Sequence, residues 1–255
     1  MAENEVAVSF GQQLTDKLID VEQALPKDFN KTRFVQNCLA VLNEKPELAK
    51  INKAQLQLGL LKGAYLGLDF MNKECYLIAY GNGVQFQTDY KGEIKFTKRY
   101  SIRPIKDIYA KVVRDGDEFE EKIIDGQASI NFKPKSFNNG EILGAFAVCL
   151  FQDGGMIYET MSKADIENVR TSYSKAANSK AWRNSFDEMA KKVVLRRLCK
   201  HIDCDFESIE ARQAWNDGSD YDFTIVERER NTEVVDAFAV ETDDVLDAEV
   251  KEVFG

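Results

Sequence analysis

Apolar residues recur at helical spacing in two stretches near the start of the chain. The first stretch spans 34–42, and in the second an apolar residue stands at every fourth position: Leu56, Leu60, Ala64 and Leu68. Asn52 stands where a helix N-cap belongs, and Gly67 where a terminating glycine belongs. The pattern therefore predicts two helices. Residues 1–30 are polar, and we expect them to form a flexible N-terminal segment.

The middle of the chain carries the patterns of β-strands. Residues 75–80 and 84–88 flank Gly81-Asn82-Gly83, which is typical of a tight hairpin turn. Ile108, Ala110 and Val112 alternate with their neighbours and predict a third strand. Two more strands are expected around the polar turn 136–140, and another after Asp153-Gly154-Gly155; their ranges are 127–132, 141–152 and 156–160.

Three further segments favour helices. Residues 89–100 suit a helix through Tyr90, Ile94 and Thr97, although Ile94 and Phe96 also suit a strand, and we favour the helix. Ser162 with Asp165 resembles a capping box, and so does Ser185 with Glu188. The second box is expected to open a long helix over 185–201, where Lys192, Arg196 and Lys200 form a basic stripe beside an apolar face.

These elements predict an α+β fold, with mixed helices and an antiparallel sheet in one compact core over 31–205. Acidic residues dominate beyond about position 210, so we expect an acidic tail over 206–255, with a mostly disordered linker at 211–240. A short amphipathic helix is expected near 243–254, from Val245, Leu246, Val250, Val253 and Phe254. So short a helix would become ordered mainly on a partner.

Composition narrows the class of protein. The hydrophobic content is 44%, which is ordinary for a folded domain, and no apolar run approaches the roughly 20 residues of a membrane span. The first residues lack the basic-then-apolar order of a signal peptide. Five cysteines without framework spacing indicate free thiols. We therefore expect a cytoplasmic protein.

Charge is unevenly distributed along the chain. The formal net charge is -9, but residues 203–255 hold 17 acids and four Lys/Arg, which leaves residues 1–202 with a net charge of +4. Residues 86–114 carry eight Lys/Arg against three acids, and residues 170–201 carry nine against two. This distribution favours a nucleic-acid partner, although the overall acidity does not.

Both basic blocks interleave cations with aromatic residues, as in grooves that bind single strands without sequence preference. Phe86 and Phe96 fit the core equally well, and a basic helix face is also compatible with plain solvation or with pairing to the chain's own acids. The candidate DNA-binding residues are Tyr90, Lys91, Lys95, Lys98, Arg99, Arg103, Lys111, Arg114, Arg170, Tyr173, Lys175, Trp182, Arg183, Lys191, Lys192, Arg196, Arg197 and Lys200.

Several enzyme classes lack their motifs. The chain contains no Gly-Lys dipeptide and hence no Walker A loop, and it has one histidine, His201, and no Cys-x-x-Cys pair. We therefore assign no catalytic residue, metal or cofactor. Glu93-Ile94-Lys95 matches a minimal nuclease element that occurs by chance in many charged proteins. A passive single-strand-binding module, a metal-dependent nuclease and an acidic adaptor remain alternatives.

An ordered set of motifs resembles the RecT branch of the RecT/Redβ phage recombinases. The set runs through Gly67-Leu68-Asp69, 75–78, 87–92, 112–119, 144–147, 172–174, Ala181-Trp182 and 188–197. The resemblance implies an ATP-independent protein that anneals single-stranded DNA and assembles into rings or helical filaments. It also implies a phage exonuclease and a host single-strand-binding protein as partners, in the cytoplasm of a bacterial host.

The resemblance also implies roles for particular residues. Lys192, Arg196 and Arg197 would contact the DNA backbone, and Tyr90, Lys91 and Lys95 fall in a family Tyr-Lys-Gly block whose role is less certain. The chain departs from the family pattern at Asp89, where glycine is frequent, and at Ala181, where proline is common. These departures weaken the expectation of a close backbone approach to phosphate at Asp89 and of a rigid loop at Ala181.

Overall fold

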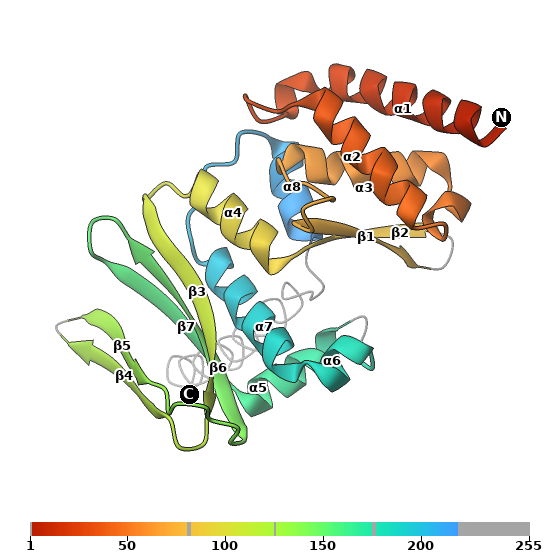
Figure 1. Ribbon diagram of the computed structural model, residues 1–255. Coiled ribbons are helices and arrows are strands. Elements are labelled where there is room, and N and C mark those ends of the chain that lie inside the picture. Colours follow the sequence, from red (N-terminus) through yellow and green to blue (C-terminus); the bar gives the residue numbers. More distant parts are fainter. Residues whose placement is uncertain (1, 81–82, 125, 175–176, 219–255) are drawn as a thin grey trace, which may run out of the picture.

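The computed structural model describes residues 2–80, 83–124, 126–174 and 177–218. Helices α1 to α3, the β1–β2 hairpin and α8 lie at one end of the molecule (Figure 1). A three-stranded sheet and a separate β4–β5 hairpin lie at the other end, with α4 and α7 between the two ends. The α+β expectation is confirmed.

The first helices follow their local sequence signals. Helices α1 (Ala2–Asp20), α2 (Lys31–Glu44) and α3 (Lys53–Tyr65) are joined by short 3-10 turns at Glu22–Ala24 and Leu48–Lys50. Asn52 caps α3 by accepting a 2.9 Å hydrogen bond from the Ala54 N–H, as predicted. Gly67 ends the helix with φ +62, a conformation that glycine adopts without steric cost.

Residues 1–30 differ from the flexible segment expected from their polarity. Most of them form α1, in which Phe10, Leu14 and Leu18 are buried in the main core. These three residues recur every four positions, so they form a narrow apolar stripe along the helix. The stripe is enough to hold α1 on α2 and α3 (Figure 1).

The β1–β2 hairpin and the helix after it form as predicted. Strands β1 (Cys75–Tyr80) and β2 (Gly83–Thr88) are antiparallel, and the Tyr80–Gly83 pairing agrees with a tight turn. Helix α4 (Tyr90–Tyr100) begins at Asp89, whose carboxylate accepts a 3.2 Å hydrogen bond from the Lys91 N–H. The helix is therefore the right choice for 89–100.

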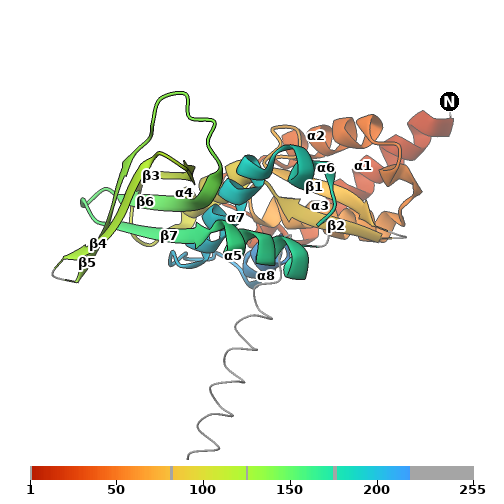
Figure 2. The same cartoon turned by 90° about the horizontal axis from the view of Figure 1, so that it is seen from below.

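The three-stranded sheet has the antiparallel order β3 (Ile105–Arg114), β6 (Ile142–Phe151) and β7 (Met156–Ser162). Its two faces are covered by different elements because side chains alternate along a strand. Ala145, Ala147 and Cys149 of β6 belong to the main core under α7 (Phe186–Lys200). Phe146 and Val148 belong to a second apolar cluster with Phe119, Ile130 and Phe132 of the β4–β5 hairpin. This hairpin lies beside the three-stranded sheet (Figure 2).

The β4–β5 hairpin was only half expected. Strand β5 (Gln127–Lys133) agrees with the predicted 127–132, but it pairs with β4 (Glu118–Ile124) in a sheet of its own. Strand β4 is mostly polar in sequence. It packs through Phe119, whose ring lies 6.2 Å from that of Phe132 and 5.2 Å from that of Phe146. Its charged residues are exposed, which hides the strand from a search for apolar runs.

Of the two predicted capping boxes, one is present. Ser162 and Asp165 cap each other at the start of α5 (Lys163–Asn168). Ser185 makes no side-chain cap, so the box with Glu188 is wrong. The reason is geometric: Ser185 also ends α6 (Lys180–Asn184) by donating its N–H to the Ala181 carbonyl at 2.9 Å, which leaves it at φ −143, ψ 49.

The packed core extends beyond position 205. Helix α8 (Ile209–Asp217), capped by Ser208, buries Ala211, Ala214 and Trp215, so residues 211–217 do not belong to a disordered linker. The rest of the linker and the helix expected near 243–254 lie outside the described residues. All five cysteines are free, and within residues 2–218 as described, no helix is both long and apolar enough to cross a membrane.

Candidate nucleic-acid interface

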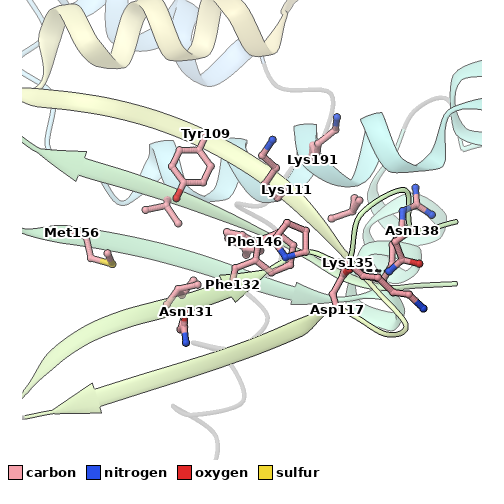
Figure 3. Close-up of a pocket in the computed structure, with 15 residues that line it drawn as sticks. Tyr109, Lys111, Asp117, Asn131, Phe132, Lys135, Asn138, Phe146, Met156 and Lys191 are labelled. Atoms are coloured by element: carbon pink, nitrogen blue, oxygen red, sulfur yellow. Dashed lines mark hydrogen bonds between the residues drawn. The ribbon is translucent and has the colours of Figure 1, made fainter. Parts of the chain in front are cut away.

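A hollow of about 670 Å³ opens between the outer face of the β3-β6-β7 sheet and the β4–β5 hairpin (Figure 3). Four basic side chains line it: Lys111, Arg114, Lys135 and Lys191. Aromatic and apolar side chains form its floor and walls: Tyr109, Ile130, Phe132, Phe146, Val148 and Met156. We call this hollow the hairpin groove.

Strand alternation places the residues of β3 in the groove. Ile108 and Ala110 belong to the main core on the α7 side of the sheet. Tyr109 and Lys111 therefore project to the opposite side, where they line the groove. Lys111 pairs across the sheet with Phe146, and Tyr109 with Val148, so each β3 residue stands beside an apolar floor residue.

The cations of the groove differ in how they are paired. Arg114 lies 3.6 Å from the Asp187 carboxylate and donates to the Gly140 carbonyl at 3.1 Å, and Lys191 binds Glu188 at 2.6 Å. Within the described part of the chain, the Lys111 and Lys135 side chains form no ion pair. An anion could therefore bind these two ammonium groups without breaking an ion pair to any residue that the structure describes.

Asp117, the acidic residue among those that line the groove, has a structural role. It accepts hydrogen bonds from the backbone N–H of Arg114 at 2.8 Å, the backbone N–H of Lys135 at 2.9 Å and the Asn138 side chain at 2.8 Å. Burial raises the pKa of Asp117, but the bonds from Asn138, Arg114 and Lys135 outweigh burial, so the pKa lies below its usual value. These donors therefore stabilise its charged form.

Most candidate residues on and after α4 do not reach the groove. Lys95, Lys98 and Arg103 form ion pairs with Glu74 at 2.6 Å, Asp107 at 3.0 Å and Asp153 at 2.6 Å, and Arg99 pairs with Asp28. Helix α4 packs on α7, on the far side of the sheet from the hairpin. Tyr90 and Lys91 are exposed at the start of α4, where the Lys91 ammonium lies 6.0 Å from the Tyr90 ring.

The expectation that Arg196 contacts DNA is contradicted by its burial. Its guanidinium forms an ion pair with Glu93, donates to the Trp215 carbonyl at 2.6 Å and stacks on the Trp215 ring at 4.3 Å. In the rest of the predicted stripe, Lys192 is half-buried and Lys200 is exposed. Because Glu93 is committed to Arg196 and Lys95 to Glu74, the Glu93-Ile94-Lys95 element does not form a nuclease site.

Trp182 is also inside the core and is not an open stacking platform. Its ring packs against Phe186 at 5.9 Å, and the Arg170 guanidinium covers it at 5.7 Å. Arg170 further binds Glu167 at 3.2 Å and the Ala177 carbonyl at 2.9 Å. The closeness of Arg170 and Trp182 in the sequence therefore reflects packing within the core.

The remaining candidates are scattered. Arg197 binds Glu159 at 2.7 Å, Arg183 is exposed and Tyr173 is half-buried, while Lys175 lies outside the described residues. Of the 18 candidates, the groove brings together Lys111, Arg114 and Lys191. The residues missed from sequence are Tyr109, Phe132, Lys135 and Asn138. Of these four residues, Lys135 had a signal in the sequence, because it is a basic residue directly before the predicted polar turn 136–140.

Comparisons with known proteins found a matching family and two similar proteins. The model of the RecT family matches residues 32–234. The chain is 31% identical over 206 residues to the protein RecT of Escherichia coli (strain K12), covering 72% of this chain and 71% of that one. It is 24% identical over 169 residues to the uncharacterized protein YqaK of Bacillus subtilis (strain 168), covering 66% of this chain and 57% of that one.

Proposed function

Because this chain belongs to the RecT family, which acts in recombination and annealing, we propose that it anneals complementary single strands of DNA without ATP. In this proposal one strand lies along the hairpin groove. The observation that carries it is that Lys111 of β3 and Lys135 of the loop after β5 line one hollow with an aromatic floor, and that neither forms an ion pair within the described residues. Cations beside stacking surfaces bind single strands independently of sequence.

The groove lowers the repulsion between two polyanions. Lys111, Lys135 and, once released from its acid, Arg114 would bind phosphates of the first strand and displace counterions. Contacts to phosphate carry no sequence information, so the bases stay free to test a second strand. Correct pairing then supplies selectivity through stacking, at about 1.4 kcal/mol per base step. No bond is made or broken, so the proposal requires no catalytic residue.

Further parts of the proposal come from family membership. Assembly of many copies into a ring or helical filament would join the grooves into one track for a long strand. A phage exonuclease that exposes single strands and a host single-strand-binding protein are the expected partners, in the cytoplasm of the bacterial host. The acidic residues 219–255 would compete with DNA for the groove or bind a partner protein.

Fluorescence transfer between two complementary labelled oligonucleotides tests the proposal. Mixing them with the protein, without ATP, should raise the annealing rate well above the rate without protein. The binding of each strand alone is measured in parallel by fluorescence anisotropy. Binding without acceleration would identify a passive single-strand-binding protein, and absence of binding at low salt would reject both readings.

A further inference from the structure

Phe137 is the most unusual residue near the groove. It lies in the loop between β5 and β6, its side chain is 100% exposed, and its φ of 52 is in the left-handed region. A bulky residue with positive φ is an outlier that costs free energy and persists only where its surroundings enforce it. The chain thus holds an aromatic ring in solvent, in a conformation better suited to glycine or asparagine.

A hydrogen-bonded frame enforces this conformation. The Asn138 side chain donates to the Asp115 carbonyl at 3.0 Å and accepts from the Gly140 N–H at 2.8 Å. Asp117 accepts from the Lys135 N–H and from the Asn138 side chain. Both flanks of Phe137 are therefore tied to the turn after β3, and the loop presents the ring from a fixed base.

The frame also fixes where Phe137 lies relative to the groove. Lys135 and Asn138, on either side of it in sequence, line the groove together at one end (Figure 3). A strand whose phosphates contact Lys135 would carry its bases within reach of a side chain two residues away. An exposed ring at that place has an apolar surface matched to a nucleobase.

We propose that Phe137 inserts between, or stacks on, bases of the single strand held in the hairpin groove. This inference rests on the proposed function, because it requires DNA in the groove. Inserted apolar side chains unstack neighbouring bases in other DNA-binding proteins. Here the ring would interrupt the stacking of the bound strand where the strand passes Phe137, so that the bases beside the ring are open to a complementary strand.

The first test places a fluorescent reporter at this position. The full-length Phe137→Trp variant should lose at least half of its added emission on saturation with an oligothymidylate, because stacked bases quench tryptophan. The native Trp182 and Trp215 are buried, so they contribute a shielded background. Ile209→Trp, which replaces an exposed residue of α8, is the matched control and should change little.

A second test removes the ring while preserving the backbone. Phe137→Asn suits a positive φ, so the loop should keep its fold and the thermal midpoint should not fall. Affinity for oligothymidylate should drop about tenfold, the scale of one base–aromatic stack. Affinity for an abasic oligomer of equal charge should not change. The difference between the two oligomers isolates the contact between the ring and a base.

The outcomes separate this inference from the proposed function. If the wild-type protein binds no oligonucleotide by anisotropy, the proposed function fails, and the inference with it. If binding is normal but Phe137→Trp emission is unchanged by oligothymidylate, the inference alone is overturned. It is also overturned if the abasic oligomer quenches equally, or if Phe137→Trp emission changes on protein dilution without DNA, since another copy of the chain would then cover the ring.

Discussion

Arg196 of α7 and Glu93 of α4 form an ion pair in which each side chain is only 3% exposed. The Thr88 hydroxyl donates a hydrogen bond to Glu93, and Arg196 donates one to the Trp215 carbonyl. The pair therefore links β2, α4, α7 and α8. A basic residue at the centre of α7, the helix whose sequence predicted contacts to DNA, is thus a structural residue.

The buried pair yields the first prediction. Arg196→Ala should lower the free energy of unfolding by about 3–5 kcal/mol, because Glu93 is left buried and unpaired. Arg197→Ala, one position away, removes a partly exposed pair with Glu159 and should cost at most about 1 kcal/mol. Denaturant unfolding measures both. A fully stable Arg196→Ala protein that has lost DNA binding would return Arg196 to the interface.

The groove lysines yield the second prediction. Lys111→Ala combined with Lys135→Ala should weaken binding to single-stranded DNA about tenfold, taking roughly 0.7 kcal/mol for each exposed ion pair. The slope of log affinity against log salt should fall by about 0.7 for each lysine removed. Both are measured by anisotropy at several salt concentrations.

The matched control for these lysines is Lys122→Ala combined with Lys133→Ala. This variant changes the net charge equally, but its lysines are paired with Glu120 and Glu118 on the same hairpin. It should bind nearly as the wild type does. Equal losses in both double variants would mean that overall charge, and not the groove, governs binding.

Asp187 lies close enough to Arg114 to compete with a phosphate for its guanidinium, which yields the third prediction. Asp187→Asn removes the carboxylate that lies 3.6 Å from the Arg114 guanidinium and should strengthen binding about twofold to fivefold. Because Asp187 is in the first turn of α7, the same change should cost about 0.3–1 kcal/mol of stability. Weaker binding at unchanged stability would show that the pair positions Arg114 for DNA.

Asp117 gives a prediction about pH. Its pKa is lowered in the folded protein, so its charged form stabilises the fold above the unfolded value of about 3.9. That stabilisation is lost as the pH falls through the lower folded value. Asp117→Asn should therefore lower the thermal midpoint by a constant amount from pH 5 to 8, and the gap to wild type should shrink below about pH 4.

The control for this titration is Asp115→Asn, two residues away, whose side chain is exposed. It should leave the thermal midpoint nearly unchanged at every pH. A gap between wild type and Asp117→Asn that persists or grows on acidification would show that the Asp117 charge does not hold the loop frame.

Elements with local causes were predictable from sequence. The caps at Asn52 and Ser162 and the terminator at Gly67 act within a few residues of themselves, so a short window contains the whole signal. Strand β4 was missed because its packing depends on the contact between Phe119 and Phe146, which lies outside any short sequence window around the strand. Helix α1 was not predicted because its buried apolar stripe consists of only three residues, Phe10, Leu14 and Leu18.

The site was less predictable than the fold, because charge in a sequence does not reveal its partner. Arg196 is neutralised by Glu93, which lies 103 positions away. Lys111 lies in β3 and Lys135 in the loop after β5, and the packing of the β4–β5 hairpin beside the sheet brings them to one groove. Basic density singled out Lys111, Arg114 and Lys191, but not the hollow that these three residues line together.

Photo-crosslinking tests most directly whether the hairpin groove holds the DNA. An oligonucleotide containing 5-iodouracil is irradiated with the full-length protein, and the crosslinked peptides are identified by mass spectrometry. We predict crosslinks at Tyr109, Phe132 or Phe137. These crosslinks should disappear in the Lys111→Ala, Lys135→Ala double variant. Crosslinks confined to α1–α3 or to Tyr90 of α4, with none in the groove, would contradict it.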